Sequence, residues 1–290
     1  MDDPFDPDNH MAYTRWRKEK LASAPLTSSE LIVEINDPRA LSASEHAALL
    51  DRIKRCNMVV YASNVLDEDN GIPRDLAAQF GLKHLDANWL ADEDGISEIK
   101  VNSNGTRQSY IPYTDRPIKW HTDGYYNTPE RKIRSMLLHC VRSAKQGGEN
   151  HLMDHEIAYL LLRDENPDFI RALTQSDAMT IPERVDDQDG VRSVQTGPVF
   201  STNADGSLHM RYTARTRSIE WKQDDMTRSA VAALEKLLAT ATEHIYQARL
   251  EPGMGLLCNN VLHDRAAFED DATTPRLLFR ARYYERIAAS

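Results

Sequence analysis

Long apolar runs and paired cysteines are both missing from this chain of 290 residues. A membrane-spanning helix needs about 20 consecutive apolar residues, and no run approaches that length, so we expect no membrane association. The cysteines are isolated, odd in number and without a Cys-x-x-Cys motif. This pattern favours buried thiols in a reducing, cytoplasmic setting. The cysteines are Cys56, Cys140 and Cys258.

Positive charge is scarce relative to negative charge. The chain has 35 Lys and Arg against 45 Asp and Glu, which gives a formal net charge of −10 at pH 7 and a pI near 5.5. This balance argues against nucleic acid, itself a polyanion, as a partner. The first ten residues, MDDPFDPDNH, are acidic and interrupted by proline. They lack the basic and then apolar order of a signal peptide, so we expect a cytoplasmic protein.

Short apolar segments alternate with amphipathic ones, which predicts strands with helices between them. Ser42 and Glu45 form a capping-box pattern that marks the start of a helix. We expect a mainly β fold with flanking helices and a double-stranded β-helix core of the jelly-roll or cupin-like type. The charged residues 1–28 are expected to be a partly irregular N-terminal arm or to lie over a neighbouring subunit, and we expect a homo-oligomer. The expected strands are 31–35, 58–61 and 135–141, and the expected helices are 42–56, 74–80, 154–163 and 227–239.

The segment Trp120-His121-Thr122-Asp123 carries the first candidate metal ligands. It follows IPYTDRPIKW, a proline-punctuated stretch that is typical of an extended chain. In an extended strand, residues two apart project from the same face, so His121 and Asp123 can reach one ion. The plain alternative is a solvated loop pair.

A second His-x-Asp pair, His84 and Asp86, provides an internal control. It lies in the acidic stretch FGLKHLDANWLADEDG, which resembles a helix. On a helix, residues two apart diverge around the axis, so the pair is poorly placed to hold one ion. We expect a surface or helix-capping role for these two residues.

A third candidate ligand, His263, follows a turn at Glu251-Pro252-Gly253 and the apolar run 255–258. Two imidazoles and one carboxylate on one face of an ion make the facial triad of non-haem Fe(II) oxygenases, which leaves the other positions open. Because the three ligands must converge from positions 121, 123 and 263, we expect residues 1–290 to form a single catalytic domain.

The segment after His263 alternates in a way that is typical of a strand. Leu277, Phe279 and Ala281 share one face, and the opposite face carries arginines. A buried strand rarely places guanidinium groups on its inner face unless an anion receives them. An edge strand with its arginines in water is the alternative. The arginines are Arg276, Arg280 and Arg282.

Taken together, these motifs resemble the TauD/TfdA family of Fe(II)- and 2-oxoglutarate-dependent dioxygenases. The resemblance runs from about Tyr110 to Tyr284. It rests on the W-H-x-D segment, on a histidine 140 residues after its Asp, and on an arginine 13 residues after that histidine. The segment Gly147-Gly148-Glu149-Asn150 is also similar to the Gly-Gly-Asp-Thr/Ser segment of the family.

The resemblance implies that His121, Asp123 and His263 bind Fe(II), and that Arg276 binds the distal carboxylate of 2-oxoglutarate. Arg280 matches a second family arginine near the substrate or cosubstrate. Asn150 stands where the family has a hydroxyl residue beside the cosubstrate, and the neighbouring His151 is an alternative donor. Because the carboxylate of Asp123 is retained, hydroxylation with O2, releasing succinate and CO2, is favoured over halogenation.

The substrate residues follow from position alone. Tyr125 and Tyr126 come directly after the metal motif, and the family places the region of Arg211 and Tyr212 near the substrate. With Arg280, they predict an aromatic pocket with a cationic end, suited to a small organic acid. Core packing of the tyrosines, a solvated basic face around Arg211, and an aromatic cage for a cationic substrate are the alternatives.

Two rival functions remain open at this point. One is a metal-binding jelly roll with a non-redox role, such as a small-molecule sensor. The other is a zinc hydrolase that uses His151 and His155, four residues apart as on one helical face. The second lacks the Glu that directly follows the first histidine in zinc proteases.

Overall fold

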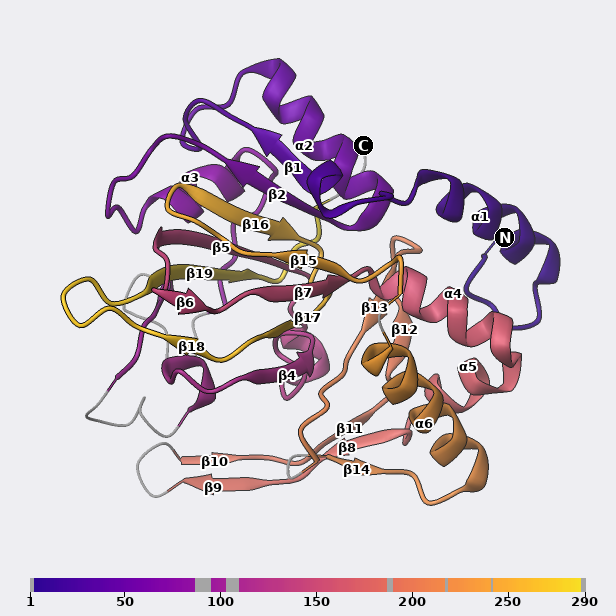
Figure 1. Ribbon diagram of the computed structural model, residues 1–290. Coiled ribbons are helices and arrows are strands. Elements are labelled where there is room, and N and C mark those ends of the chain that lie inside the picture. Colours follow the sequence, from indigo (N-terminus) through magenta and orange to yellow (C-terminus); the bar gives the residue numbers. More distant parts are fainter. Residues whose placement is uncertain are drawn as a thin grey trace.

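Two β-sheets that enclose a shared apolar interior form the centre of the structure (Figure 1). This computed structural model describes residues 3–86, 95–102, 110–186, 190–216, 219–240 and 242–287. In spatial order, the six-stranded sheet consists of β1 (Ile32–Glu34), β2 (Met58–Ala62), β16 (Met254–Cys258), β5 (Ser135–Arg142), β19 (Leu277–Tyr283) and β3 (Ser97–Ile99). The four-stranded sheet consists of β15 (Tyr246–Ala248), β7 (Asn150–Met153), β17 (Leu262–Arg265) and β4 (Ile118–His121). β1 and β2 pair in parallel, whereas β16, β5 and β19 are antiparallel to their neighbours.

Alternation along the strands of the six-stranded sheet divides its side chains between two apolar clusters. Leu137 and Phe279 point to the outer face, where they pack with residues of the helices that cover it. Leu138 and Leu278 point to the inner face and pack with Leu152 of the four-stranded sheet. The expected mainly β architecture with flanking helices is therefore present.

The helices cover both ends of this pair of sheets. α2 (Ala43–Cys56) and α3 (Ile72–Ala78) lie on the outer face of the six-stranded sheet. α2 begins with the expected capping box, because the side chain of Ser42 and that of Glu45 each bond the other's backbone. α4 (His155–Glu165), α5 (Pro167–Leu173) and α6 (Asp225–Ala239) pack together on the other side. None of the helices that the structure describes combines the length and the apolar character needed to cross a lipid bilayer.

Smaller sheets connect the helical side to the central sheets. The short 3₁₀ helices are η1 (Ser28–Leu31), η3 (Ile111–Tyr113) and η4 (Pro129–Arg131). β8 (Met179–Ile181) pairs with β11 (Gln195–Gly197) and β14 (Glu220–Trp221). The two-stranded pairs are β9 (Arg184–Asp186) with β10 (Gly190–Arg192), β12 (Phe200–Thr202) with β13 (Leu208–Met210), and β6 (Gln146–Gly147) with β18 (Phe268–Glu269).

The N-terminal segment is not the irregular arm that its charge pattern predicts. Residues His10–Ser23 form helix α1, which packs against α4 of the same chain. Tyr13 donates hydrogen bonds to the carbonyl of Leu160 and to Asp164, and Trp16 packs against the same apolar cluster. Most of the residues around these aromatic anchors are charged, so the sequence does not show the apolar contacts of the helix; the charged residues are Arg15, Arg17, Lys18, Glu19 and Lys20.

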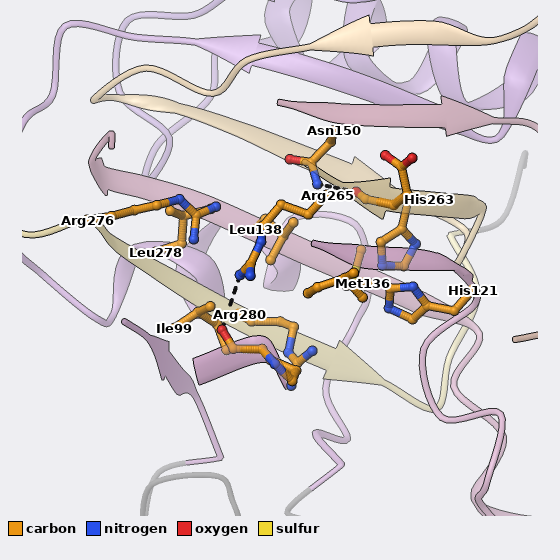
Figure 2. A pocket seen from close by; sticks show the side chains of 13 residues that line it. Ile99, His121, Met136, Leu138, Asn150, His263, Arg265, Arg276, Leu278 and Arg280 are labelled. Atoms are coloured by element: carbon orange, nitrogen blue, oxygen red, sulfur yellow. Dashed lines mark hydrogen bonds between the residues drawn. The ribbon is translucent and has the colours of Figure 1, made fainter. Parts of the chain in front are cut away.

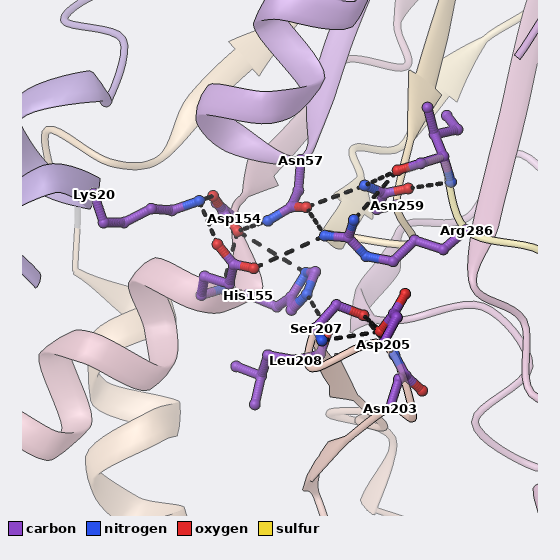
Figure 3. A network of polar contacts seen from close by, with 12 residues as sticks. Lys20, Asn57, Asp154, His155, Asn203, Asp205, Ser207, Leu208, Asn259 and Arg286 are labelled. Atoms are coloured by element: carbon purple, nitrogen blue, oxygen red, sulfur yellow. Dashed lines mark hydrogen bonds and ion pairs between the residues drawn. The ribbon is translucent and has the colours of Figure 1, made fainter. Parts of the chain in front are cut away.

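Lys20 ties α1 to the interior through a buried polar network (Figure 3). Its ammonium group lies 2.6 Å from Asp154 and 2.5 Å from Glu156 at the start of α4. Asn57 donates a hydrogen bond of 2.9 Å to the same Asp154 and accepts one from Asn259, in the turn between β16 and β17. The network therefore connects three helices with the turn that precedes His263.

The control pair His84 and Asp86 is not on a helix, and Asp86 is not at the surface. Leu85 instead bridges to Tyr283 of β19. His84 is exposed and bonds Glu285, whereas the Asp86 carboxylate is buried and lies 2.8 Å from Arg282. A buried guanidinium needs a counter-charge, and Asp86 supplies it. Residues 87–94 of this stretch lie outside the described residues.

Candidate active site

His121 and His263 face each other across two neighbouring strands. They are direct partners in the antiparallel pairing of β4 with β17, and the centroids of their rings lie 4.2 Å apart. Asp123 follows the end of β4 by two residues, and its Oδ1 lies 3.6 Å from Nε2 of His121. One ligand atom from each of the three residues lies within 4.8 Å of the others. The structure thus brings together the three residues expected as metal ligands.

Hydrogen bonds to backbone carbonyls determine which ring nitrogen of each histidine is available to bind a metal ion. Nδ1 of His121 lies 2.9 Å from the carbonyl of Lys119, and Nδ1 of His263 lies 2.9 Å from the carbonyl of Val261. Because a carbonyl only accepts hydrogen bonds, each Nδ1 carries the proton and each Nε2 keeps its lone pair for a metal ion. Burial and the neighbouring His121 lower the pKa of His263 to about 3, so its ring is neutral.

Asp123 is an ionised carboxylate in a buried position. Burial alone would raise its pKa, but the Arg280 guanidinium, 3.3 Å away, holds the pKa of Asp123 well below its ordinary value. Its buried Oδ2 is the oxygen that pairs with Arg280. Two imidazoles and an ionised carboxylate fit the donor set of a non-haem Fe(II) centre.

A pocket between the two sheets opens beside the histidines (Figure 2). Its apolar walls include Met136, Leu138 and Leu278, and Arg276 lies at the end away from His121 and His263. The residues that complete the lining are Ile99, Pro112, Ile118, Asn150, Asp264, Arg265 and Arg280. Of the three expected arginines, Arg276 and Arg280 therefore line a pocket, and Arg282 is buried beside Asp86; none of the three faces bulk water as on an edge strand.

Arg276 is buried and holds a guanidinium nitrogen without a partner. Its Nη1 forms no hydrogen bond with any residue that the structure describes, and its charge lies 5.0 Å from the centre of the Phe268 ring. Burial lowers the pKa of Arg276 from its ordinary value. Arginine stays protonated even so, and an unpaired buried guanidinium is stabilised by an anion that reaches it. A carboxylate at this end of the pocket would supply that anion.

Asn150 lines the pocket, and His151 does not. The amide of Asn150 donates a hydrogen bond of 2.5 Å to the carbonyl of Asp264. The side chain of His151 is 40% exposed and lies 3.1 Å from the carboxylate of Asp264. His155 begins α4, and its Nε2 bonds the carbonyl of Leu208. His151 and His155 therefore have separate partners and do not converge as a zinc pair.

Arg265 also lines the pocket, although none of the sequence motifs identified it. It is buried and donates hydrogen bonds to the carbonyls of Pro112, Thr114 and Arg116, which holds the segment before β4 against β17. Burial and the nearby Arg276 charge lower the pKa of Arg265 to about 9. A signal existed in the sequence, because Arg265 stands two residues after His263 and so shares its strand face.

The residues expected to contact the substrate fall into two groups with different surroundings. Tyr125 and Tyr126 contact each other edge to face at 5.1 Å, and the Tyr126 hydroxyl accepts a hydrogen bond from Arg282. Arg211 donates to the carbonyls of Met179 and Gln195, while the buried Tyr212 stacks on a tryptophan. These contacts occupy Arg211 and Tyr212 within the fold, and a substrate contact from either stays a prediction.

Comparison with known proteins identifies the family of this chain. Residues 21–282 match the model of the taurine catabolism dioxygenase TauD, TfdA family. The chain belongs to the TauD/TfdA family. The match covers most of the chain and includes every residue of the triad and its pocket, so the resemblance seen in the sequence motifs is confirmed.

Two relatives carry the name uridine-5'-phosphate dioxygenase. The TauD/TfdA chain described here is 32% identical to a uridine-5'-phosphate dioxygenase of Amycolatopsis sp over 180 residues, which cover 59% of this chain and 62% of that protein. It is 29% identical to a uridine-5'-phosphate dioxygenase of Streptomyces sp over 203 residues, which cover 66% and 70%. The match to the first thus spans less than two thirds of that relative.

Solved structures share the fold at low sequence identity. The non-haem iron oxygenase OrfP in complex with Fe and alpha-ketoglutaric acid superposes with a TM-score of 0.58, at 16% identity, over 84% of this chain and 80% of OrfP. An asparagine oxygenase in complex with Fe(II), 3-hydroxyasparagine and succinate gives a TM-score of 0.58, at 12% identity, over 92% and 91%. The fold of this family member is therefore that of iron oxygenases.

Proposed function

We propose that this chain is an Fe(II)- and 2-oxoglutarate-dependent dioxygenase that hydroxylates a small anionic molecule. His121, Asp123 and His263 would hold the iron, and Arg276 with Asn150 would hold 2-oxoglutarate. The observation that carries the proposal is the convergence of three metal-ligand atoms beside a pocket that ends at an unpaired buried guanidinium. We also infer that the two central sheets are the walls of a double-stranded β-helix core.

Bound iron and 2-oxoglutarate supply the oxidising chemistry, in which O2 is consumed, succinate and CO2 are released, and an oxygen atom reaches the substrate. The residues of the chain prepare the site for it. The backbone carbonyls of Lys119 and Val261 orient the two imidazoles, and Arg280 keeps Asp123 ionised. The apolar walls keep water away from the reacting centre.

Arg276 is the residue best placed to bind the far carboxylate of 2-oxoglutarate. Its planar fork can donate two parallel hydrogen bonds to a carboxylate, which a lysine cannot do. The Phe268 ring beside the guanidinium supports the charge from the side. Asn150, tied to the carbonyl of Asp264, offers its amide to the same ligand.

The substrate that we propose is a phosphorylated or otherwise anionic small molecule of nucleotide type. Support comes from the names of two relatives, which are uridine-5'-phosphate dioxygenases. A net charge of −10 argues against a nucleic-acid polymer and leaves the small molecule as the partner. The free, buried cysteines are consistent with a cytoplasmic protein. A homo-oligomeric assembly and a single domain for residues 1–290 stay predictions.

Anaerobic titration tests the proposal directly. Fe(II) is added to the apoprotein, followed by 2-oxoglutarate, and the visible absorption is recorded for a charge-transfer band. The band should form in the wild type and should be absent in Asp123→Ala. Exposure to O2 in the presence of candidate substrates should then release succinate. A metal-binding sensor would bind iron without forming succinate, and that result would contradict the proposed activity.

A further inference from the structure

A second group of cationic side chains lies near the triad but outside the pocket of Arg276. Thr213 forms an isolated bridge with His121, and Arg215 follows it by two residues. Arg192, at the end of β10, places its guanidinium 4.9 Å from the centre of the Tyr126 ring. Neither of these arginines lines the pocket between the sheets. Arg192 thus contacts the segment that follows the triad residue Asp123, and Arg215 belongs to the segment that pairs with His121.

The position of Arg192 is set by contacts that leave its charge available. Stacking on the face of Tyr126 holds the guanidinium without neutralising it. The Tyr126 hydroxyl accepts a hydrogen bond of 3.1 Å from Arg282, which fixes the ring beneath Arg192. The Nε of Arg192 is buried and forms no hydrogen bond. A buried donor that is left unpaired is unfavourable, so this geometry is suited to receive an acceptor.

Some arginines near the triad have a carboxylate partner, and others do not. Arg280 has Asp123 at 3.3 Å, and Arg282 has Asp86 at 2.8 Å. Neither Arg192 nor Arg215 has a carboxylate partner among the residues that the structure describes. Thr213 bridges His121, and Arg192 stacks on Tyr126, so both arginines belong to segments that contact residues 121–126. In a protein with a net charge of −10, two such cations without a carboxylate partner are a specific feature.

We propose that Arg192 and Arg215 form the anion subsite of the substrate and bind a phosphomonoester. This inference rests on the proposed function and names the chemistry that selects the substrate. A phosphomonoester carries close to two negative charges at pH 7 and offers three acceptor oxygens, which matches two guanidinium groups. A monocarboxylate would leave one of the two charges unmatched. The subsite is separate from the Arg276 pocket, so substrate and 2-oxoglutarate bind on different arginines.

Calorimetric titration of the anaerobic Fe(II)- and 2-oxoglutarate-loaded enzyme tests the subsite. The ligands are uridine 5'-phosphate, uridine and inorganic phosphate, so the first two differ only in the phosphate group. The wild type should bind uridine 5'-phosphate at least tenfold more tightly than uridine. Arg192→Gln and Arg215→Gln should each weaken uridine 5'-phosphate at least tenfold and leave uridine unchanged. The lysine variants should retain part of the affinity, because they keep the charge but lose the fork.

Controls separate this inference from the proposed function. Arg228→Gln, at an exposed position on α6 paired with Asp225, should leave every affinity unchanged. The charge-transfer band reports the iron and 2-oxoglutarate site alone, and its absence in the wild type would overturn the proposed function. With the band present, equal affinity for uridine and uridine 5'-phosphate overturns the subsite. The subsite is also overturned if neither uridine 5'-phosphate nor inorganic phosphate binds detectably. It is likewise overturned if both glutamine variants bind inorganic phosphate as tightly as the wild type does.

Discussion

The side chain of Asn260 hydrogen-bonds to both the N–H and the carbonyl of Asp123. Its Oδ1 accepts a hydrogen bond of 2.8 Å from the Asp123 N–H, and its amide donates to the Asp123 carbonyl at 2.9 Å and to the Ile133 carbonyl at 2.7 Å. Asn260 lies in the turn before His263, with a left-handed φ of 51° that asparagine tolerates. One buried side chain thus links the two chain segments that supply the metal ligands.

The first prediction follows from this clamp. Asn260→Ala should raise the dissociation constant for Fe(II) by about ten- to a hundred-fold, because Asp123 loses its positioning contacts. Unfolding titrations should show a loss of about 2–4 kcal/mol, since several buried backbone groups become unpaired. Asn203→Ala, in the turn between β12 and β13, is the matched control. Wild-type iron affinity in Asn260→Ala would show that the turn alone positions Asp123.

The second prediction concerns the triad. His121→Ala, Asp123→Ala and His263→Ala should each reduce succinate formation to below about 1% of the wild-type rate, because even an outer-shell partner of a metal is worth ten- to a hundred-fold. Iron content by metal analysis should fall with it. His84→Ala, an exposed residue bonded to Glu285, should change neither quantity. Retained activity in any of the first three variants would remove that residue from the ligand set.

The third prediction concerns the cosubstrate. Arg276→Lys should raise the KM for 2-oxoglutarate by at least about tenfold, equal to about 1.4 kcal/mol, because the planar fork is lost. The test is the initial rate of succinate formation at varied 2-oxoglutarate. Arg280→Lys should act mainly through Asp123, its partner at 3.3 Å, and lower iron affinity. If Arg280→Lys alone raises the 2-oxoglutarate KM, the roles of the two arginines are reversed.

The fourth prediction concerns the buried pair of Asp86 and Arg282. Asp86→Asn should cost about 3–5 kcal/mol in the free energy of unfolding, because it leaves Arg282 buried without a counter-charge. Urea unfolding at pH 7 measures this difference. Replacing the exposed Asp225 by Asn should have an effect within about 0.5 kcal/mol.

The same pair gives a pH dependence with a definite sign. Burial would raise the pKa of Asp86, but Arg282, Tyr284 and Arg131 hold it below its ordinary value of 3.8. A folded-state pKa below the unfolded value stabilises the protein above the unfolded pKa, and the stabilisation is lost as pH falls through the folded value. The difference between wild type and Asp86→Asn should therefore be constant near neutral pH and shrink below about pH 4. A constant difference down to pH 2 would contradict the assignment.

Local pattern was sufficient to predict the cluster of candidate metal ligands and several secondary-structure elements. His121 and Asp123 stand two apart in an extended segment, and strand geometry alone places them on one face. The capping box at Ser42 predicted the start of α2 to the residue, because a cap is a contact over three positions. The alternation after Pro275 predicted which arginines turn inward.

Such local patterns could not predict contacts between segments that are distant in the sequence. Asp86 reads as a surface residue in its own acidic stretch, and it is buried only because Arg282 of β19 lies beside it. Helix α1 looks too charged to pack, yet Lys20 is paired with Asp154 of α4. The sequence around Arg192, VDDQDGVRS, is mostly acidic or polar, and nothing in that pattern indicates a cationic subsite.

The sequence by itself therefore determined the candidate ligand set, the inward arginines and the family, because these depend on residue type and on spacing along one or two strands. The tertiary structure decided which charge meets which counter-charge. Arg280, Arg282, Arg276 and Arg192 are chemically alike, and only the fold gives the first two a carboxylate and leaves the last two open to a ligand. The physical reason is that a Coulomb interaction depends on distance and burial in space, which neighbours in the chain do not specify.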